Sequence, residues 1–230
     1  MILLPVLNEA EAVPDILQRI PTAELQKSNW KTNVILIDGG SEDGTVEIAS
    51  AYDCQILNQI GKGKGSAMRQ GFELFIDGED DALVILDADG TYHPEDIPRL
   101  LKKLETCDVV VGDRLRGSME QGAMTRFNYL GNLLLTWMAV FLHGMNINDL
   151  CTGYWAFNRD TVETLKLNSI YFEIEAEMYS ACAFEGLNLQ HVPIRYSVRK
   201  GEAKLGSVRD GVAILRKLIV RRLFPIPHEG

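Results

Sequence analysis

The sequence lacks most of the features that cross-link a chain or anchor it in a bilayer. Its 230 residues include four cysteines that lie far apart and form no C-x-x-C pair: Cys54, Cys107, Cys151 and Cys182. This spacing supports neither a zinc site nor a disulfide framework, so we expect a reducing compartment. No run reaches the roughly 18 apolar residues of a membrane-spanning helix, and no signal peptide opens the chain. Any membrane contact is therefore expected to be peripheral, unless a partner subunit supplies an anchor.

Positive charge is scarce in most of the chain and gathers at its end. The net charge is −9, yet from Arg195 onward nine Lys and Arg stand against three Asp and Glu, so the other 194 residues carry −15. An acidic body argues against nucleic-acid binding, whereas a basic tail suits an anionic membrane surface. No Gly-x-Ser-x-Gly or Cys/His arrangement suggests a covalent nucleophile, and the four histidines have no metal-ligand spacing.

Strand and helix patterns alternate along the first half of the chain. Continuous apolar runs predict strands covered on both faces, and periodic stretches predict the helices between them. The strands are expected at 1–6, 33–38, 54–57, 82–86 and 108–112, and the helices at 10–20, 45–51, 66–75 and 94–104. This alternation gives right-handed βαβ units. We therefore predict an α/β fold with a mainly parallel central sheet flanked by helices.

The second half has a different pattern. Residues 128–142 are apolar on nearly every helical face, and a further helix at 174–184 and a strand at 190–198 are expected. The segment 208–224 is amphipathic, with Lys217 and Arg221 roughly opposite one apolar stripe. The stripe consists of Val208, Val212, Leu215, Ile219 and Leu223. Without a repeat or clear linker, we predict one domain at 1–205, followed by an amphipathic, basic C-terminal appendage at 206–230.

Acidic residues follow three of the predicted strands. Glu9 comes just after the first strand, Asp38 ends the second, and Asp87 and Asp89 follow the strand at 82–86. Parallel α/β sheets bind ligands at the carboxyl ends of their strands, so we expect one site. Two carboxylates separated by one residue suit Mg²⁺ or Mn²⁺, and such a metal would neutralise a departing diphosphate. A solvated turn is the alternative for a DxD triplet, but the neighbouring acid-ended strands favour the site.

Two neighbouring features have a functional and a structural interpretation. Asp38 either receives a hydrogen bond from a base or ribose, or caps a helix while Gly39 and Gly40 make the turn. Asp43 is the better candidate for a helix cap, because the next helix begins near Thr45. The GKGKG sequence at 61–65 is either a phosphate cradle or a surface loop, and it does not fit a Walker A motif.

Eight motifs occur in the order typical of one enzyme family. Between Met1 and about Leu205 they are LPVLNEAE, VILIDGGSEDGT, GKGSAMRQGF, VILDADGTYHPEDIP, DVVVGDR, DLCTGYWAF, FEIEAEM and VPIRYSVRKGEAKL. In this series the chain resembles the family 2 inverting glycosyltransferases, and within them the archaeal dolichyl-phosphate mannose and glucose synthases. The resemblance implies a GT-A fold and a Mg²⁺- or Mn²⁺-dependent transfer of a hexose from a nucleotide-sugar donor to dolichyl or polyprenyl phosphate.

The resemblance also assigns roles to residues. Donor contacts are implied for Pro5, Leu7, Glu9, Asp38, Lys64, Asp87, Ala88 and Asp89, and metal binding for Asp87 and Asp89. The diphosphate and the acceptor phosphate are implied to lie against Arg114, Arg126, Arg199 and Lys204, cations that we expect in loops or at element ends together with Arg116. Asp89 and Arg114 are the implied catalytic residues, and Glu173 and Glu175 either position the acceptor or end a solvated helix. A phosphate acceptor is already anionic at about pH 7, so direct displacement needs no strong general base.

Departures from the family pattern leave alternatives open. Only one acid, Asp38, follows the second strand, and Thr91 stands where some relatives carry a metal-binding glutamine. A nucleotidyltransferase would need a Gly- and Arg-rich loop near the first strand, which LPVLNEAEAV lacks. A non-catalytic nucleotide-sugar-binding protein is the other alternative. GDP-mannose, UDP-glucose and UDP-N-acetylglucosamine stay open as donors. The residues of the IDGGS and GAMTRFN segments are closer to those of relatives that use a UDP-sugar.

The expected location is peripheral, on the cytoplasmic side of a membrane. Residues 208–224 and 128–142 are the candidate membrane contacts, with core packing as the alternative for the second. No nucleic-acid partner is expected, whereas a homo-oligomer or a membrane partner subunit stays open.

Overall fold

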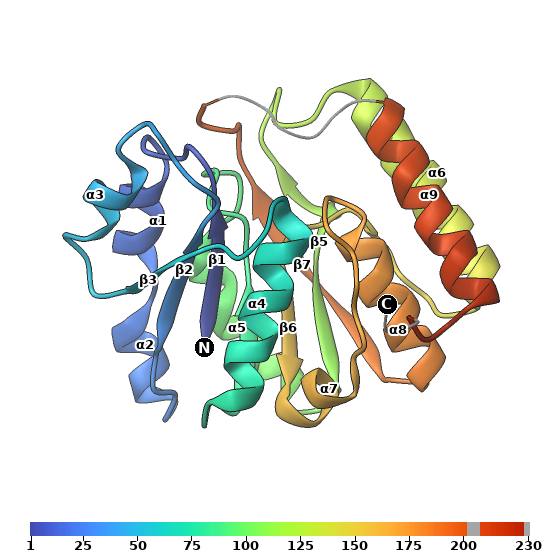
Figure 1. Cartoon of the computed structure of the whole chain (residues 1–230), viewed down its shortest axis with the longest axis horizontal. Helices are drawn as coiled ribbons and strands as arrows, with labels where there is room; N and C mark the ends of the chain where they lie inside the picture. Colours follow the sequence, from blue (N-terminus) through green and yellow to red (C-terminus); the bar gives the residue numbers. More distant parts are fainter. Residues whose placement is uncertain (202–207, 228–230) are drawn as a thin grey trace.

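The computed structural model describes residues 1–201 and 208–227. Seven strands form one sheet in the order β3-β2-β1-β4-β6-β5-β7, with helices on both of its faces (Figure 1). The strands are β1 Ile2–Val6, β2 Val34–Asp38, β3 Gln55–Asn58, β4 Ala82–Ile85, β5 Val109–Met119, β6 Trp155–Asn158 and β7 Leu189–Tyr196. The helices are α1 Val13–Arg19, α2 Thr22–Lys27, α3 Thr45–Ala49, α4 Lys64–Asp77, α5 Ile97–Leu104 after the 3₁₀ turn Pro94–Asp96, α6 Arg126–His143, α7 Arg159–Thr164, α8 Ile174–Glu185 and α9 Val208–Leu223. The predicted mainly parallel α/β architecture is confirmed.

The parallel strands β1, β2 and β4 bring three loops to one edge of the sheet. β1 lies between β2 and β4, with Leu3 opposite both Ile35 and Ile85. Every residue of β2 and of β4 is buried, which is why both appear in the sequence as unbroken apolar runs. The residues that follow these strands therefore lie close together at the carboxyl edge, the upper edge in Figure 1.

One central strand was not predicted. β6 pairs antiparallel with β4 and β5, and Trp155 at its start lies opposite Ile85 at the end of β4. Its sequence, WAFN, contains no Val, Ile or Thr, the β-branched residues that occur in the strands that were predicted. Its reversed direction has a consequence for function, because the residues before Trp155 arrive at the same edge as the residues after β4.

Helices α1, α2, α3 and α5 pack on one face of the sheet through a core that includes Ile16, Leu25, Ala49 and Leu100. On the other face lie α4, α7 and α8, with Phe72, Val162 and Met178 in the second core. Alternate residues of the buried strands enter opposite cores, as the two-residue period of a strand requires.

Helices α6 and α9 lie side by side outside α8 and form one flank of the molecule (Figure 1). Ile214 and Leu218 of α9 are buried in the second core, so this helix is packed on the domain, while the predicted domain boundary at 205 and 206 lies outside the described residues. Most of the predicted apolar stripe of α9 is exposed, whereas Lys217 and Arg221 face inward. The opposite side of the helix, with Lys217 and Arg221, is the side that meets the protein.

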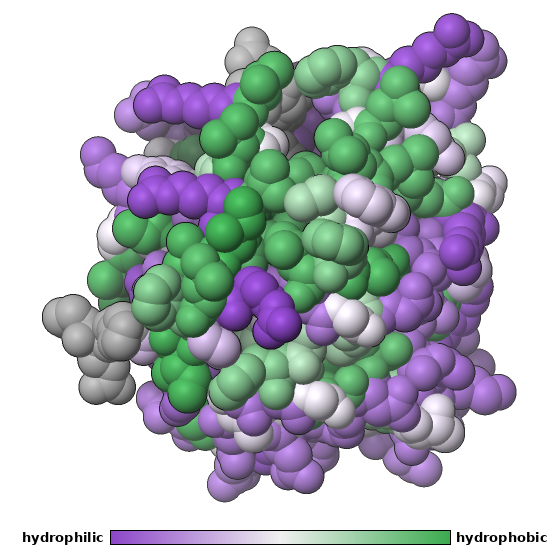
Figure 2. Space-filling model, turned by 90° about the vertical axis from the view of Figure 1, so that its right-hand side faces the viewer, coloured by the Kyte–Doolittle hydropathy of each residue, from purple (hydrophilic) through white to green (hydrophobic). Residues whose placement is uncertain are grey.

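An extensive apolar surface results on this flank (Figure 2). The exposed residues are Phe127, Leu130, Leu134, Trp137 and Phe141 of α6, and Val208, Val212, Ile219 and Leu223 of α9. Trp137 and Phe141 stack with ring centroids 5.6 Å apart. Core packing, the alternative for the apolar segment 128–142, holds only for its minor face, where Asn132, Thr136 and Ala139 are buried. Within the described residues, no helix is both long enough and apolar enough to cross a bilayer. We call the exposed apolar surface formed by these residues of α6 and α9 the α6–α9 face.

Candidate active site

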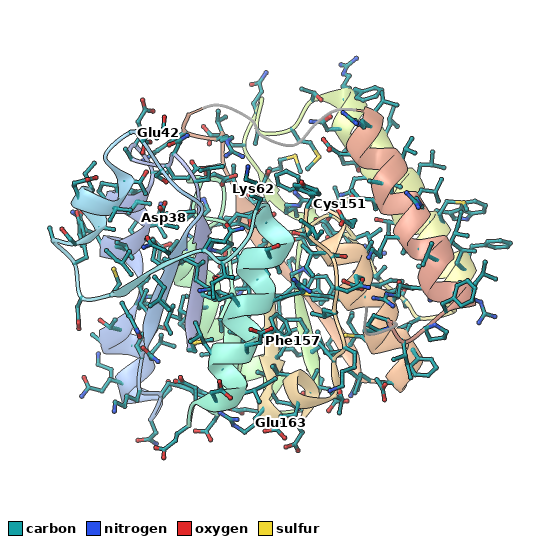
Figure 3. All side chains as sticks on the ribbon, viewed as in Figure 1. Asp38, Glu42, Lys62, Cys151, Phe157 and Glu163 are labelled. Atoms are coloured by element: carbon teal, nitrogen blue, oxygen red, sulfur yellow. The ribbon has the colours of Figure 1, made fainter. Side chains whose placement is uncertain are left out.

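The acids that follow β1, β2 and β4 gather at the carboxyl edge of the sheet, as predicted. Val6 at the end of β1 lies opposite Asp38 at the end of β2. Figure 3 labels Asp38, Lys62 and Cys151 near this edge, with Phe157 and Glu163 toward the opposite end of the molecule. The loops that follow β1, β2 and β4 therefore belong to one region of the molecule.

Arg199 joins two of these acids. Its guanidinium donates to Asp89 Oδ2 at 2.8 Å and to Glu9 Oε1 at 2.7 Å. The segment that carries Arg199 is fixed at the same place, because the backbone N–H of Lys200 donates to the carbonyl of Asp89 at 3.0 Å. The other carboxylate oxygen of Asp89 accepts from the backbone N–H and hydroxyl of Thr91, at 2.9 and 2.5 Å. The segment after β7 thus lies across the DxD turn, and its Arg199 pairs with Asp89, the second acid of that turn.

Lys64 holds the first acid of the turn. Its ammonium lies 2.6 Å from Asp87 Oδ1 and 2.6 Å from Glu175 Oε1 at the start of α8. Burial alone would lower the pKa of Lys64, but the charges of Asp87 and Glu175 outweigh it and raise the pKa above its ordinary value, so the ammonium stays charged. Glu175 is buried and paired, which excludes the solvated helix end as its interpretation.

Close packing around Lys64 explains the glycines of the GKGKG sequence. Gly63 has φ +83°, and a Cβ there would meet the ring of Tyr171. A Cβ on Gly65 would come within 2.6 Å of the Ser169 carbonyl oxygen. The backbone N–H of Ser66 donates to the Ile170 carbonyl at 3.2 Å. The start of α4 is therefore packed against residues 169–171, and the surface-loop interpretation applies only to the exposed Gly61 and Lys62.

Gly153 brings the turn before β6 against the DxD acids. A Cβ at this position would overlap the carboxylate of Asp87. The backbone N–H of Gly153 donates to the hydroxyl of Tyr92 at 2.7 Å. Gly153 was not among the predicted site residues, although the motif DLCTGYWAF contains it, because the sequence does not reveal that β6 runs antiparallel beside β4.

Asp38 is held by its own turn. Its two carboxylate oxygens accept from the backbone N–H groups of Gly40 and Ser41 at 3.0 to 3.1 Å, and the Ser41 hydroxyl donates at 2.5 Å. Asp43 accepts from the backbone N–H of Thr45 at 3.0 Å, but the residue directly before α3 is Gly44, so the prediction of Asp43 as the helix cap was wrong. Of the other implied donor contacts, Ala88 is buried, Pro5 is half-buried in β1, and Leu7 is exposed beside the site.

Arg114 lies within β5, where the sequence predicted a loop or an element end. It is buried and forms a bidentate pair with Asp149, with Nε and one terminal nitrogen each 2.7 Å from a carboxylate oxygen. Asn132 of α6 donates to the same carboxylate at 2.5 Å. Arg116 also belongs to β5. The location predicted for these two cations was wrong, because β5 continues seven residues beyond the apolar run that revealed it.

Aromatic rings connect Arg114 to the acidic turn. Its guanidinium lies 5.1 Å from the centroid of the Tyr196 ring, which stands edge-on to Tyr92 at 5.3 Å. Tyr92 in turn holds Gly153. Asp149, Asn132 and Tyr92 were not predicted, since nothing in their spacing distinguishes them from core polar residues. Arg126, the first residue of α6, is exposed, and Lys204 lies outside the described residues.

The donor set fits a divalent cation. Asp87 and Asp89 offer hard oxygen ligands in one turn, although no cluster of three or more His, Cys, Asp or Glu ligands occurs within residues 1–201 and 208–227. Mg²⁺ and Mn²⁺ commonly bind through one or two carboxylates and take their remaining ligands from water and substrate phosphates. Thr91, at the position of a glutamine in some relatives, hydrogen-bonds to Asp89. Burial raises the pKa of the nearby Cys151 thiol to about 12, so it is neutral and not a nucleophile.

The fold and the site define a class of protein: an α/β protein in which acids and cations meet at the carboxyl edge of the sheet, where such sheets bind their ligands. Residues 1–166 match the model of glycosyl transferase family 2, and the chain belongs to this family. This membership makes it a glycosyltransferase and decides against the nucleotidyltransferase alternative.

Relatives of known name agree with the family. The chain is 37% identical over 223 residues to glycosyltransferase AglJ of Haloferax volcanii, covering 96% of this chain and 71% of that protein. It is 30% identical to a dolichyl-phosphate hexose transferase of the same organism, with 92% and 89% covered. Glucosyl-3-phosphoglycerate synthase of Mycobacterium tuberculosis, solved with Mn²⁺, UDP and its product, has the same fold, with a TM-score of 0.69, 21% identity, and 100% of this chain and 81% of that chain covered.

Proposed function

We propose that the protein transfers a hexose from a nucleotide sugar to a polyprenyl phosphate such as dolichyl phosphate. The observation that carries this proposal is the position of the α6–α9 face. Helix α6 begins with Arg126 and holds Asp149, the partner of Arg114, through Asn132. An apolar surface and a cation-lined site that share one helix suit an acceptor with an apolar tail and a phosphate head. The names of the relatives support the same acceptor class.

The donor is proposed to bind along the acidic edge. Asp38, Pro5, Leu7 and Glu9 would meet the nucleotide, and the DxD turn with Ala88 would meet the ribose and diphosphate. A protein of the same fold has been solved with UDP, which supports a nucleotide as part of the donor. Among the donors left open by the sequence, a UDP-sugar is the one we favour.

A divalent cation, Mg²⁺ or Mn²⁺, would be held by Asp87 and Asp89 and would supply charge neutralisation for the leaving diphosphate. The residues of the chain contribute the rest. Arg199 and Lys64 already neutralise Asp89 and Asp87, and each has a charge that a diphosphate can recruit. Arg114, Arg126 and Lys204 are proposed to bind the phosphates of donor and acceptor. The acceptor phosphate needs no deprotonation at about pH 7, so positioning and charge stabilisation carry the reaction, with Asp89 and Arg114 as the proposed catalytic residues.

We further propose that the α6–α9 face rests on the cytoplasmic surface of a membrane. Aromatic residues such as Trp137 and Phe141 favour the interface between headgroups and acyl chains. The exposed cations Arg209, Arg216 and Arg222 of α9 border the apolar residues, and such cations are attracted to anionic lipids. A second copy of the chain or a membrane subunit covering this face is the competing outcome.

The test is transfer from radiolabelled GDP-mannose, UDP-glucose and UDP-N-acetylglucosamine to dolichyl phosphate, with Mg²⁺ or Mn²⁺. Asp89→Ala is the control, since it removes one proposed metal ligand and the partner of Arg199. Metal-dependent label in the lipid phase that the variant loses supports the proposal and identifies the sugar. Donor binding without any lipid product would refute the acceptor.

A further inference from the structure

Glu177 of α8 is a fully buried carboxylate that the proposed reaction does not use. It faces α9, where Arg221 donates to its Oε1 and the ammonium of Lys217 lies 3.6 Å from the same oxygen. A buried charge is strongly unfavourable unless it is paired and hydrogen-bonded. The pair between Glu177 and Arg221 therefore fixes how α9 sits on α8.

The second oxygen of Glu177 holds a loop. Oε2 accepts from the backbone N–H groups of Asn168 and Ser169, at 2.9 and 2.6 Å. The side-chain oxygen of Asn168 accepts in turn from Arg221 at 2.9 Å and from Lys217 at 3.1 Å. Residues 168 and 169 are thus held by α8 and α9 together, through one carboxylate.

The held loop covers the start of α4. Ser169, Ile170 and Tyr171 are the residues that would meet a Cβ on Gly63 or Gly65, and Ile170 accepts from the backbone N–H of Ser66. Lys64 stands between those two glycines. Its ammonium contacts Asp87 in the DxD turn. A continuous series of hydrogen bonds and close contacts therefore runs from Arg221 in α9 to the proposed metal ligand.

We infer that Glu177, held by Arg221, is a positioning residue for the donor end of the active site. It fixes residues 168–171, these fix the start of α4, and α4 aims Lys64 at Asp87. This inference rests on the proposed function, because it assumes that the DxD turn binds the donor nucleotide. It adds a role for α9, the helix that also carries part of the α6–α9 face.

A structural role alone makes a different prediction from a positioning role. If Arg221 only stabilises the fold, its replacement weakens nucleotide binding to the same degree whether or not Lys64 is present. If Arg221 acts through Lys64, its replacement has little further effect once Lys64 is gone, because residues in one network are not additive. A double-mutant cycle on nucleotide affinity therefore separates the two roles.

The cycle consists of the parent, Arg221→Met, Lys64→Met and the double variant, in the full chain. The matched control is Arg222→Met, which changes the exposed neighbour of Arg221 on the same helix. UDP and GDP are titrated by calorimetry with Mn²⁺ present, and a thermal midpoint is recorded for each protein so that every titration is made on folded protein. If Arg221→Met does not fold, Arg221→Gln takes its place, because it keeps a hydrogen-bond donor for Glu177.

We expect Arg221→Met to weaken nucleotide binding about tenfold, as the loss of a supporting residue does in other sites. The nucleotide affinity of Arg222→Met should stay within about twofold of the parent's, and Arg221→Lys should recover most of the affinity that Arg221→Met loses. In the Lys64→Met background, adding Arg221→Met should change the affinity by less than about twofold. Unchanged affinity in Arg221→Met, or an equal loss in both backgrounds, would overturn the inference while nucleotide binding by the parent still stands. A parent that binds neither nucleotide would instead overturn the proposed function, and the inference with it.

Discussion

Lys64 and Asp87 form an ion pair of 2.6 Å between the first residue of α4 and the loop after β4. Replacing Lys64 by Met should lower kcat/KM for the donor roughly 10²-fold, because a preorganised charge next to the proposed position of the leaving diphosphate is lost. The control is Lys62→Met, two residues earlier in the same GKGKG sequence and exposed. Initial rates at varied donor concentration give kcat/KM for each of the two variants. Equal losses in the two variants would mean that the general charge of the loop matters and not the pair with Asp87.

Arg199 offers the same test on the other acid of the turn. Arg199→Met removes the cation that joins Glu9 to Asp89, and we expect donor turnover to fall by about 10². Lys200→Met is the control, since its ammonium pairs at 3.3 Å with Asp15, away from the DxD acids. The two variants are compared in the same transfer assay. An Arg199→Met enzyme with full activity would show that this cation only closes the ligand-free site.

Gly153 tests the close approach of the turn before β6 to Asp87, one of the two proposed metal ligands. Gly153→Ala should displace the Asp87 carboxylate and reduce transfer well beyond any loss of stability, because its Cβ has no space. Gly131→Ala in α6 is the matched control, since a Cβ there meets nothing within 4 Å. This control should stabilise the protein by about 0.5–1 kcal/mol, as alanine does in a helix. Thermal unfolding and Mn²⁺ dependence are measured on both. A Gly153→Ala enzyme with parental Mn²⁺ dependence would contradict the predicted displacement.

The free energy of unfolding should fall as the pH is lowered through the range in which histidine titrates. Burial lowers the pKa of His93, His143 and His191 below 6.5 in the folded protein. The unfolded chain therefore binds more protons near that pH, so stability rises with pH there and is lost on acidification.

One of these histidines gives a specific test. His191 Nε2 accepts from the backbone N–H of Asn148 at 3.2 Å, which only the neutral ring can do. His191→Gln keeps an acceptor that does not titrate and should reduce the acid dependence. Urea unfolding at about pH 7.5 and at about pH 5.5 measures the difference. An unchanged slope against pH would exclude His191 as a contributor.

The α6–α9 face should bind anionic lipid vesicles. Replacing both Trp137 and Phe141 by Ser removes two large exposed apolar side chains and should weaken binding to phosphatidylserine vesicles several-fold, with nucleotide affinity unchanged. Ile76→Ser, an exposed apolar residue of α4, is the control. Vesicle sedimentation measures binding, and light scattering reports any oligomer. Parental vesicle binding by the double variant would contradict the membrane proposal, and loss of an oligomer instead would assign the face to a second copy.

The sequence was sufficient for the elements whose burial pattern is strong. β2 and β4 are buried at every position, so their apolar runs and the acids that follow them predicted the carboxyl edge. It was not sufficient for β6, whose sequence WAFN has no β-branched residue and whose direction depends on its neighbours β4 and β5. The turn that brings Gly153 to Asp87 could not be predicted without that direction.

The pairing of charges was likewise beyond the sequence. Lys64 and Glu175 are 111 positions apart, and Arg199 and Glu9 are 190 apart, so no local spacing connects them. The stripe of α9 shows a related limit, because helical periodicity identifies two faces but not which one meets the protein. Here the face with Lys217 and Arg221 meets it, since Glu177 supplies a buried partner.

The choice of acceptor tests the central claim most directly. The protein is incubated with its radiolabelled donor and Mn²⁺ in the presence of equal amounts of detergent-solubilised dolichyl phosphate and 3-phosphoglycerate, since the synthase of the same fold has been solved with phosphoglyceric acid. Our account predicts label in the lipid phase, released by mild acid as the free sugar and absent with Asp89→Ala. Label found only in phosphoglycerate, or no lipid product from a protein that binds the donor, would contradict it.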